Sequence, residues 1–258
     1  MKYALHVRSA RPALAGFAER LGEEIVANGG VVLEDRESSP DMVLAVGGDG
    51  TMLGAVQTAV DWDVPVLGFN LGTLGFLTEA DPDDLSAVVK RLESGDFHID
   101  ARLTVSASTD MAQAVGVNDV VVEKIDSTRL VSLEVIIDGT EFATYRADGL
   151  IIATPTGSTA YSFSAGGPVV DPQVEALVLT PVASHSLFDR PLVLPADAEI
   201  DIRVHRDRLV RVNVDKTDLG QLSEGEIVKV RRGGRPARFV TFGTTRFAGL
   251  VRSKFKLD

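Results

Sequence analysis

The sequence contains no cysteine, and this absence excludes disulfide bonds and thiolate metal sites. No apolar run is long enough to cross a bilayer, and the first ten residues, MKYALHVRSA, lack the pattern of a signal peptide. Together these absences predict a cytoplasmic protein that does not enter a membrane.

Basic residues are too few to balance the acidic ones. The chain has 26 Lys and Arg against 37 Asp and Glu, which gives a formal net charge of −11. Because no basic patch offsets this charge, the composition argues against a nucleic-acid partner. Two explanations of the acidity remain open: a salt-loving organism whose proteins stay soluble through surface carboxylates, or an acidic protein from a GC-rich genome.

The remaining composition is that of an ordinary globular protein, with 45% hydrophobic and 24% charged residues in a chain of 258. Apolar runs predict strands at 3–7, 31–33, 42–46 and 64–69. Helical spacing predicts helices between them and after Asp81, which we expect to be an N-cap. Alternating strands and helices of this kind predict an α/β domain with a Rossmann-like parallel sheet.

After about residue 96, short β-branched runs replace the helical periodicity. Asp138-Gly139 between two such runs indicates a β-hairpin. The later runs, among them Phe239-Val240, continue the pattern. We therefore predict an α/β domain over 1–97, a mainly β domain over 98–241, and a tail over 242–258 that packs back on the first domain.

One stretch, 41–56 (DMVLAVGGDGTMLGAV), predicts a buried strand, a glycine turn and a helix. Bare amides and the helix N-terminus favour a phosphate there, so the carboxylate of Asp49 needs a separate explanation. Asp49 is either a helix N-cap or Asx-turn residue, or a group that takes part in chemistry. The turn is neither a P-loop, because Met52 follows Thr51, nor a dinucleotide fingerprint, because Leu53 stands where its third glycine belongs.

A second stretch, 148–168 (DGLIIATPTGSTAYSFSAGGP), predicts a strand that ends in a turn rich in hydroxyl side chains and glycine. Such a turn suits a sugar, a phosphate or an amide, and Tyr161 could stack on a base. The alternative is a Ser/Thr-rich surface loop that only connects strands.

Several motifs stand in one order along the chain: GGDGT, NLGTLGFLTE, Asn118-Asp119, DGLIIATPTGSTAY and HSLFDRP. In this order and spacing, from about residue 43 to 215, the sequence resembles the NAD kinase family in an archaeal-like form. Single GGDG elements also occur in 6-phosphofructokinases and in lipid kinases, whereas the later segments resemble NAD kinases in particular.

The resemblance implies an enzyme that transfers a phosphoryl group from ATP or polyphosphate to the 2′-hydroxyl of the adenosine ribose of NAD, giving NADP. It implies that Asp49 activates this hydroxyl, which agrees with the need of a secondary alcohol for a proton acceptor. It also implies donor contacts at Gly47, Gly48, Gly50 and Thr51, Mg²⁺ bound with the donor, and a homodimer or homotetramer.

By the same resemblance, NAD contacts fall on Asp49, Gly50, Asn118, Asp119, Arg146, Asp148, Thr156, Thr159, Ala160, Tyr161, Ser162, Phe163, Ser164 and Ala183. Arg146 could instead meet a ligand of a partner subunit or form a surface ion pair. His185 in the HSLFDRP segment is expected to be a support rather than the general base.

Lys216 departs from the family pattern, which has glycine after Asp215. This departure puts a ligand contact by Asp215 in doubt. Two other functions remain open: a related GGDG kinase for a lipid or a sugar, and a non-catalytic NAD-binding sensor.

Overall fold

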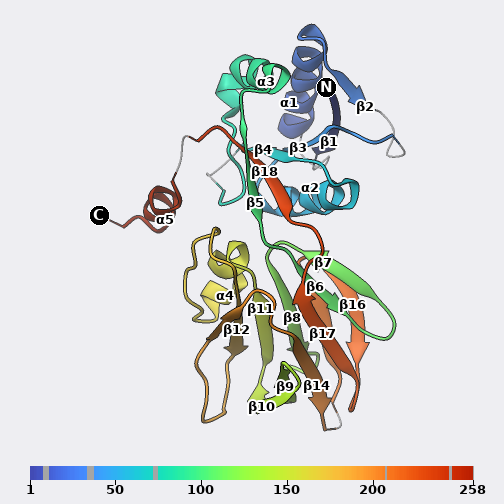
Figure 1. Ribbon diagram of the computed structural model, residues 1–258, viewed down its shortest axis with the longest axis vertical. Coiled ribbons are helices and arrows are strands. Elements are labelled where there is room, and N and C mark those ends of the chain that lie inside the picture. Colours follow the sequence, from blue (N-terminus) through green and yellow to red (C-terminus); the bar gives the residue numbers. More distant parts are fainter. Residues whose placement is uncertain (8–11, 34–37, 72–74, 207, 244–245, 258) are drawn as a thin grey trace. The chain divides into compact units, whose positions relative to one another are not determined.

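The computed structural model describes residues 1–7, 12–33, 38–71, 75–206, 208–243 and 246–257. The chain divides into two compact units (Figure 1). The first unit comprises Met1–Ala101 and Ala237–Asp258, and the second comprises Arg102–Pro236. The chain therefore leaves the first unit once and returns to it near its end.

The first unit is built on a sheet whose described strands follow the order β2-β1-β3-β4-β18-β5. These strands are β1 (Lys2–Val7), β2 (Val31–Leu33), β3 (Met42–Val46), β4 (Val66–Phe69), β5 (His98–Arg102) and β18 (Ala237–Thr241). The pairs β1–β2, β1–β3, β3–β4 and β4–β18 are parallel. Every residue of β3 is buried, as expected for a central strand of a parallel sheet covered on both faces.

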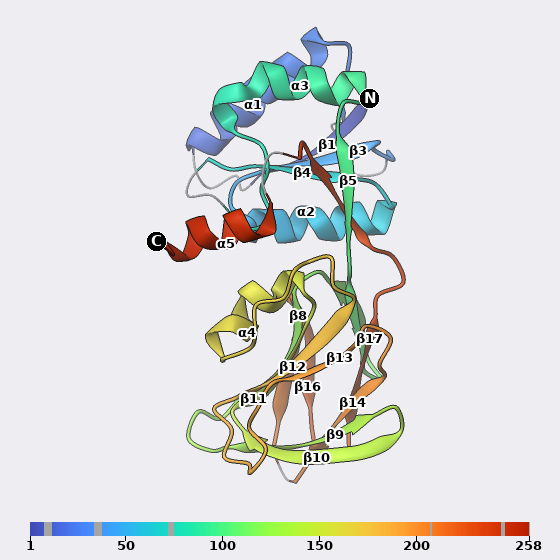
Figure 2. The ribbon, with the colours of Figure 1, turned by 60° about the vertical axis from the view of Figure 1, so that its left-hand side comes forward.

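Helices cover both faces of this sheet, with α1 and α3 on one side and α2 on the other (Figure 2). The helices are α1 (Pro12–Ala27), α2 (Asp49–Trp62) and α3 (Leu85–Ser94). The apolar stripe of α1 is buried as predicted, through Leu14, Phe17, Leu21 and Ile25. A short 3₁₀ turn, η1 (Pro82–Asp84), precedes α3, and Asp81 caps it by accepting a hydrogen bond from the Asp83 amide at 2.9 Å.

The strand order places a topological switch point between β1 and β3, because the chain moves from β1 to β2 on one side and then to β3 on the other. In open α/β sheets ligands bind outside the carboxyl ends of the strands at such a point. The glycine turn that begins at Gly47 follows β3 at this edge, and the Gly47 amide donates to the Phe69 carbonyl at 3.0 Å. The turn is thus fixed between the ends of β3 and β4.

The second unit consists of two antiparallel sheets packed face to face. One sheet has the order β10-β9-β14-β17-β6-β7, and the other has the order β13-β12-β11-β8-β15-β16. Their bounds are β6 (Val105–Ser108), β7 (Gln113–Gly116), β8 (Asp119–Lys124), β9 (Val131–Ile137), β10 (Thr140–Ala147), β11 (Gly149–Ala153), β12 (Ala176–Val182), β13 (Leu192–Pro195), β14 (Ile200–His205), β15 (Val210–Val214), β16 (Thr217–Leu222) and β17 (Ile227–Arg232).

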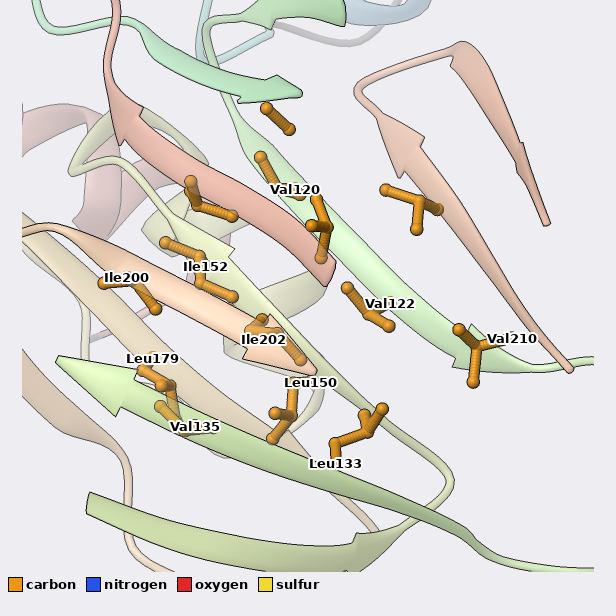
Figure 3. Close-up of a cluster of buried hydrophobic side chains, with 14 of the residues drawn as sticks. Val120, Val122, Leu133, Val135, Leu150, Ile152, Leu179, Ile200, Ile202 and Val210 are labelled. Atoms are coloured by element: carbon orange, nitrogen blue, oxygen red, sulfur yellow. The ribbon is translucent and has the colours of Figure 1, made fainter. Parts of the chain in front are cut away.

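Alternate residues of these strands form the core between the two sheets (Figure 3). Val120 and Ile152 of one sheet point toward Leu133 and Ile202 of the other, and all four side chains are fully buried. The residues between them face the opposite side of the sheet, where Val121 and Ile151 belong to a smaller cluster. The predicted Asp138-Gly139 hairpin joins β9 to β10, with positive φ angles of 49° and 76°.

The chain end differs from the expected domain division. Sequence analysis assigned Phe239-Val240 to the β-rich part, but β18 pairs in parallel with β4, with Phe239 opposite Val66. A short β-branched run does not indicate which sheet it joins, and this one returns to the first unit. The following helix α5 (Phe247–Phe255) also belongs to the first unit.

Candidate active site

The turn between β3 and α2 requires glycine at its first position. Gly47 has a φ of 150°, and a Cβ at this residue would lie 2.4 Å from Thr51 Oγ1. Gly48 is the N-cap of α2, and its carbonyl accepts the amides of Thr51 and Met52 at 2.8 and 3.1 Å. Gly48 and Gly50 are exposed at the helix N-terminus, where the helix dipole favours an anion.

The carboxylate of Asp49 bonds to a distant turn and not to its own helix. Its Oδ2 accepts the amide of Phe76 at 3.0 Å, and its Oδ1 accepts the amide of Leu77 at 3.2 Å. Since Gly48 is the N-cap, the interpretation of Asp49 as a helix cap is wrong. The two amides instead fix the orientation of the carboxylate at the carboxyl edge of the sheet.

Gly75 allows this close approach of the two turns. A Cβ on Gly75 would lie 2.0 Å from Asp49 Oδ1 and 2.7 Å from Thr78 Oγ1. Each oxygen of an ionised carboxylate has two lone pairs. Each Asp49 oxygen uses one of them to accept an amide, so the second lone pair can accept a further hydrogen bond. Sequence analysis noted the motif at 70–79 but missed its bonds to Asp49; its central residues, 72–74, lie outside the described residues.

Phe76 connects this turn to the C-terminal helix. Its ring lies 6.1 Å from the ring of Phe255, at an interplanar angle of 46°, and Lys254 Nζ lies 5.5 Å from its centroid. The tail therefore packs on the residue whose amide holds Asp49.

In the second unit, the structure brings two of the predicted motifs together. Thr154 Oγ1 donates to the Val117 carbonyl at 2.5 Å, and the Thr154 amide donates to the Asn118 carbonyl at 2.8 Å. A Cβ on Gly157 would lie only 2.1 Å from the Asn118 carbonyl oxygen. The Asn118-Asp119 segment and the TPTGSTAY turn therefore form one packed structure.

Asp119 occupies an unusual environment for a carboxyl group, with only 6% of the residue exposed. Burial, together with the nearby negative charge of Asp215, raises the pKa of Asp119 to about 7. Its carboxyl group therefore gains and loses a proton near neutral pH. Such shifted carboxyl groups are common at functional sites.

Several hydroxyl groups of the second motif shape the turn itself. This turn contains a 3₁₀ segment, η2 (Thr156–Thr159), and one helical turn, α4 (Tyr161–Ser164). Ser158 Oγ donates to the Pro155 carbonyl at 2.6 Å and accepts the Val170 amide at 2.9 Å. Ser162 Oγ lies 2.9 Å from Thr180 Oγ1 and is fully buried.

Other members of the same turn face outward. Tyr161 and Phe163 are 42% and 41% exposed, and Ser164 is also exposed. Thr159 and Ala160 are partly buried, and Thr156 is buried. The turn thus presents two aromatic rings and the hydroxyl groups of Tyr161 and Ser164 on a support of buried hydroxyl groups.

The remaining predicted contacts lie at the other end of β11. Strand register places Ala153 opposite Asp119 but Gly149 opposite Glu123, roughly 13 Å away at about 3.3 Å per residue. At this second end, Asp148 forms a salt bridge with Lys124 at 2.5 Å, Arg146 is exposed, and Ala183 has a φ of 46°. Burial first, and then the charges of Glu123, Asp148 and Asp119, raise the pKa of Tyr161, so charged residues from both ends of β11 act on this group.

His185 is exposed, and its amide donates to the Arg146 carbonyl at 2.8 Å. Among the described residues, no three or more His, Cys, Asp or Glu side chains gather in a way that could hold a metal ion. In the same residues, no helix is long and apolar enough to span a membrane.

Two family profiles match the chain. The profile of the ATP-NAD kinase N-terminal domain matches residues 19–97, and that of the ATP-NAD kinase C-terminal domain matches residues 117–242. The NAD kinase of Moorella thermoacetica is 41% identical over 230 residues, covering 87% of this chain and 74% of the relative. The NAD kinase of Geobacter metallireducens is 37% identical over 248 residues, covering 94% and 86%.

Solved structures agree with these relatives. The yeast NADH kinase in complex with NADH superposes with a TM-score of 0.83 at 27% identity, covering 100% of this chain and 87% of that one. An NAD kinase from Archaeoglobus fulgidus in complex with ATP gives a TM-score of 0.83 at 26% identity and covers 100% of both chains.

An α/β unit and a mainly β unit form the architecture of the class of kinases to which the matched structures belong, and this confirms the predicted fold class. Within that class, the chain belongs to the NAD kinase family, which is a family of enzymes. The alternatives of a lipid or sugar kinase and of a non-catalytic sensor are not favoured by these matches.

Proposed function

We propose that this protein transfers a phosphoryl group from ATP or polyphosphate to the 2′-hydroxyl of the adenosine ribose of NAD and so forms NADP. The observation that carries the proposal is the Asp49 carboxylate, held by the amides of Phe76 and Leu77 at the start of α2. A carboxylate repels bound phosphates, so its position in this turn calls for a function, and acceptance of the hydroxyl proton is the function proposed here. Membership of the NAD kinase family supports the substrate.

In the proposed reaction Asp49 accepts the proton of the 2′-hydroxyl as the oxygen attacks the phosphoryl group. The hydroxyl oxygen forms the new O–P bond, and the donor leaves with the electron pair of the bond that breaks. The two amides keep the carboxylate in one orientation, so that a free lone pair can meet the hydroxyl group. We expect the exposed turn at Gly48 and Gly50 to bind the donor phosphates. The amides of Gly47 and Thr51 already donate to the carbonyls of Phe69 and Gly48, so the donor contacts predicted at these two residues would use other atoms.

Residues of the second unit bind the dinucleotide in this proposal. The exposed ring of Tyr161 offers a stacking surface, and the neighbouring Phe163 and Ser164 are also accessible. Asn118 and Asp119 supply hydrogen bonds to a ribose or a base. The remaining predicted contacts at Thr156, Thr159, Ala160, Ser162, Arg146, Asp148 and Ala183 stay predictions.

We expect Mg²⁺ to enter with the donor, because phosphate oxygens and water supply most of the ligands that this ion needs. The described residues hold no group of three or more His, Asp or Glu side chains that could bind the ion without the donor. We further propose a cytoplasmic homodimer or homotetramer.

The proposal is tested by incubating the protein with NAD, Mg²⁺ and either ATP or polyphosphate, at low and high salt, and measuring NADP. We expect NADP with at least one donor, and the comparison identifies which donor is used. NADH in place of NAD shows whether the reduced form is also accepted. Absence of NADP with both donors at every salt concentration would contradict the proposed function.

A further inference from the structure

The carboxylate of Asp215 accepts three consecutive backbone amides. Its Oδ2 accepts from Val117 at 2.8 Å, and its Oδ1 accepts from Asn118 at 2.9 Å and from Asp119 at 3.1 Å. Asp215 stands between β15 and β16, so these bonds join residues nearly 100 positions apart in the sequence. A carboxylate bonded to several amides in a partly buried site is a strong structural restraint.

The carbonyl groups of the same three residues are also bonded. The Thr154 hydroxyl group donates to the Val117 carbonyl, and the Thr154 amide donates to the Asn118 carbonyl. The amide of Asp215 donates to the Asp119 carbonyl at 3.0 Å. Thr154 and Asp215 therefore form hydrogen bonds with all six backbone N–H and C=O groups of Val117–Asp119. Any displacement of this segment would have to break at least one of these bonds.

The space around Asp215 is as restricted as its bonds. A Cβ on Gly116 would lie 2.9 Å from the Asp215 carboxyl carbon. Asp215 itself has a φ of 48°, in the left-handed region, whereas Lys216 is not among the residues with positive φ. Lys216 in place of the expected glycine therefore leaves this turn intact, because the unusual φ angle falls on Asp215.

Asp215 also brings a negative charge close to the buried Asp119 carboxyl group. Burial raises the pKa of Asp215, while its three amide bonds and Lys216 act in the opposite direction. The charge of Asp119 in turn raises the pKa of Tyr161 in α4. The titratable groups that interact with Asp119 are therefore Asp215, whose own neighbour is Lys216, and Tyr161.

We propose that Asp215 is a positioning residue for the dinucleotide site: it fixes the backbone beneath Asn118 and Asp119 and keeps a negative charge beside the Asp119 carboxyl group. This inference rests on the proposed function, in which Asn118 and Asp119 meet NAD. Asp215 has no need to touch NAD itself, since its oxygens are directed at the three amides.

The main test compares Asp215→Asn with Asp215→Glu and with Asp218→Asn as the matched control. Asp218 is an exposed aspartate of the same hairpin that accepts the nearby Gly220 amide and forms an exposed ion pair with Arg211 at 3.8 Å. For Asp215→Asn we expect the KM for NAD to rise by about tenfold to a hundredfold, because a small displacement of binding groups is costly. We expect Asp218→Asn to match the wild type and Asp215→Glu to recover part of the loss.

The pH dependence of NAD binding separates this role from a purely structural one. Removing the charge at position 215 lowers the pKa of Asp119, so the midpoint of the pH profile in Asp215→Asn should move to lower pH by about one unit or more. A KM and a pH profile equal to those of the wild type would overturn the proposal.

Hydrogen exchange at the amides of Val117, Asn118 and Asp119 tests the same claim on the wild-type protein, even if Asp215→Asn fails to fold. We expect these three amides to exchange far more slowly than the amides of exposed loops, and fast exchange would overturn the inference. If the wild type forms no NADP with any donor, the proposed function fails, while NAD affinity by calorimetry and the amide exchange still decide the role of Asp215.

Discussion

Three aspartates, Asp49 of the first unit and Asp119 and Asp215 of the second, differ in what their carboxyl groups contact. Asp49 is partly exposed and accepts two amides of a neighbouring turn. Asp119 is buried and close to a second carboxylate, whereas Asp215 accepts three amides. The sequence predicted that Asp49 has a special role, because a carboxylate in an anion-binding turn needs a reason. The amide partners were not predictable, since every residue except proline has a backbone amide and the sequence does not indicate which of them bonds to a given side chain.

The close approach of Gly75 to Asp49 leads to a first prediction. In Gly75→Ala the new Cβ would lie 2.0 Å from Asp49 Oδ1, so the carboxylate or the turn must move. We expect the rate of NADP formation to fall by about tenfold to a hundredfold. Gly16→Ala is the control, because a Cβ on Gly16 meets nothing within 4 Å. Equal rates for Gly75→Ala and the wild type would show that this contact does not position Asp49.

The buried Asp119 leads to a prediction about stability and pH. Its pKa rises from 3.8 to about 7 on folding, so the folded state binds the proton more tightly than the unfolded state. The contribution of Asp119 to the free energy of unfolding is therefore fully present below about pH 4, and it is lost as the pH rises through about 7. Urea unfolding should show that Asp119→Asn removes this part of the pH dependence, whereas Asp218→Asn retains it. An unchanged dependence in Asp119→Asn would contradict the assignment.

At the scale of single elements, hydrophobic pattern and turn chemistry predicted much of the structure. The strands at 31–33 and 42–46, the apolar stripe of α1, the cap at Asp81 and the hairpin at Asp138-Gly139 are all present. Each depends on contacts that are local in sequence or on a clear alternation of buried and exposed residues. The partner of β18 was not predictable in this way, because pairing with β4 depends on the whole chain.

The hydroxyl-rich turn of 154–164 shows the same limit for the candidate site. The resemblance implied NAD contacts at several of its hydroxyl groups, among them Ser162, and gave no role to Ser158. In the structure both Ser158 and Ser162 are fully buried and bonded within the protein. A sequence shows how many hydroxyl groups a turn has, whereas their direction depends on the fold of the turn.

Gly157 allows a prediction about the packing of this turn. In Gly157→Ala the Cβ would lie 2.1 Å from the Asn118 carbonyl oxygen, which is a backbone atom and cannot rotate away. We expect a loss of about 1–3 kcal/mol of stability and a weaker affinity for NAD. Thermal unfolding and calorimetry measure the two effects. Gly234→Ala, whose Cβ would meet nothing within 4 Å, should leave both unchanged. Wild-type affinity in Gly157→Ala would show that the turn and the Asn118 segment are not coupled.

At the scale of the whole molecule, the sequence predicted an α/β part, a mainly β part and the family. The return of the chain to its first unit was predicted only for the tail at 242–258, whereas the chain already re-enters this unit at Ala237, where no compositional boundary marks the change. The net charge of −11 is a property of the complete chain and acts through repulsion among many carboxylates.

This charge predicts how the stability depends on salt. Raising the ionic strength from about 0.01 M to about 0.15 M screens the repulsion, so we expect the Tm to increase. NaCl and KCl at equal ionic strength should act alike, because screening depends on charge and not on ion identity. If the Tm continues to rise as the salt concentration reaches the molar range, this would favour a salt-loving organism over a GC-rich genome as the explanation of the acidity. A Tm that falls between the two lower concentrations would contradict the argument.

The central claim is that Asp49 accepts the proton of the ribose hydroxyl group, and the most direct measurement is the rate of NADP formation by Asp49→Asn at saturating NAD and donor. The amide side chain is almost the same size but cannot accept this proton as a carboxylate does. We predict a rate lower by about a hundredfold to ten-thousandfold, with NAD binding by calorimetry within a few-fold of the wild type. Full turnover by Asp49→Asn would contradict the claim.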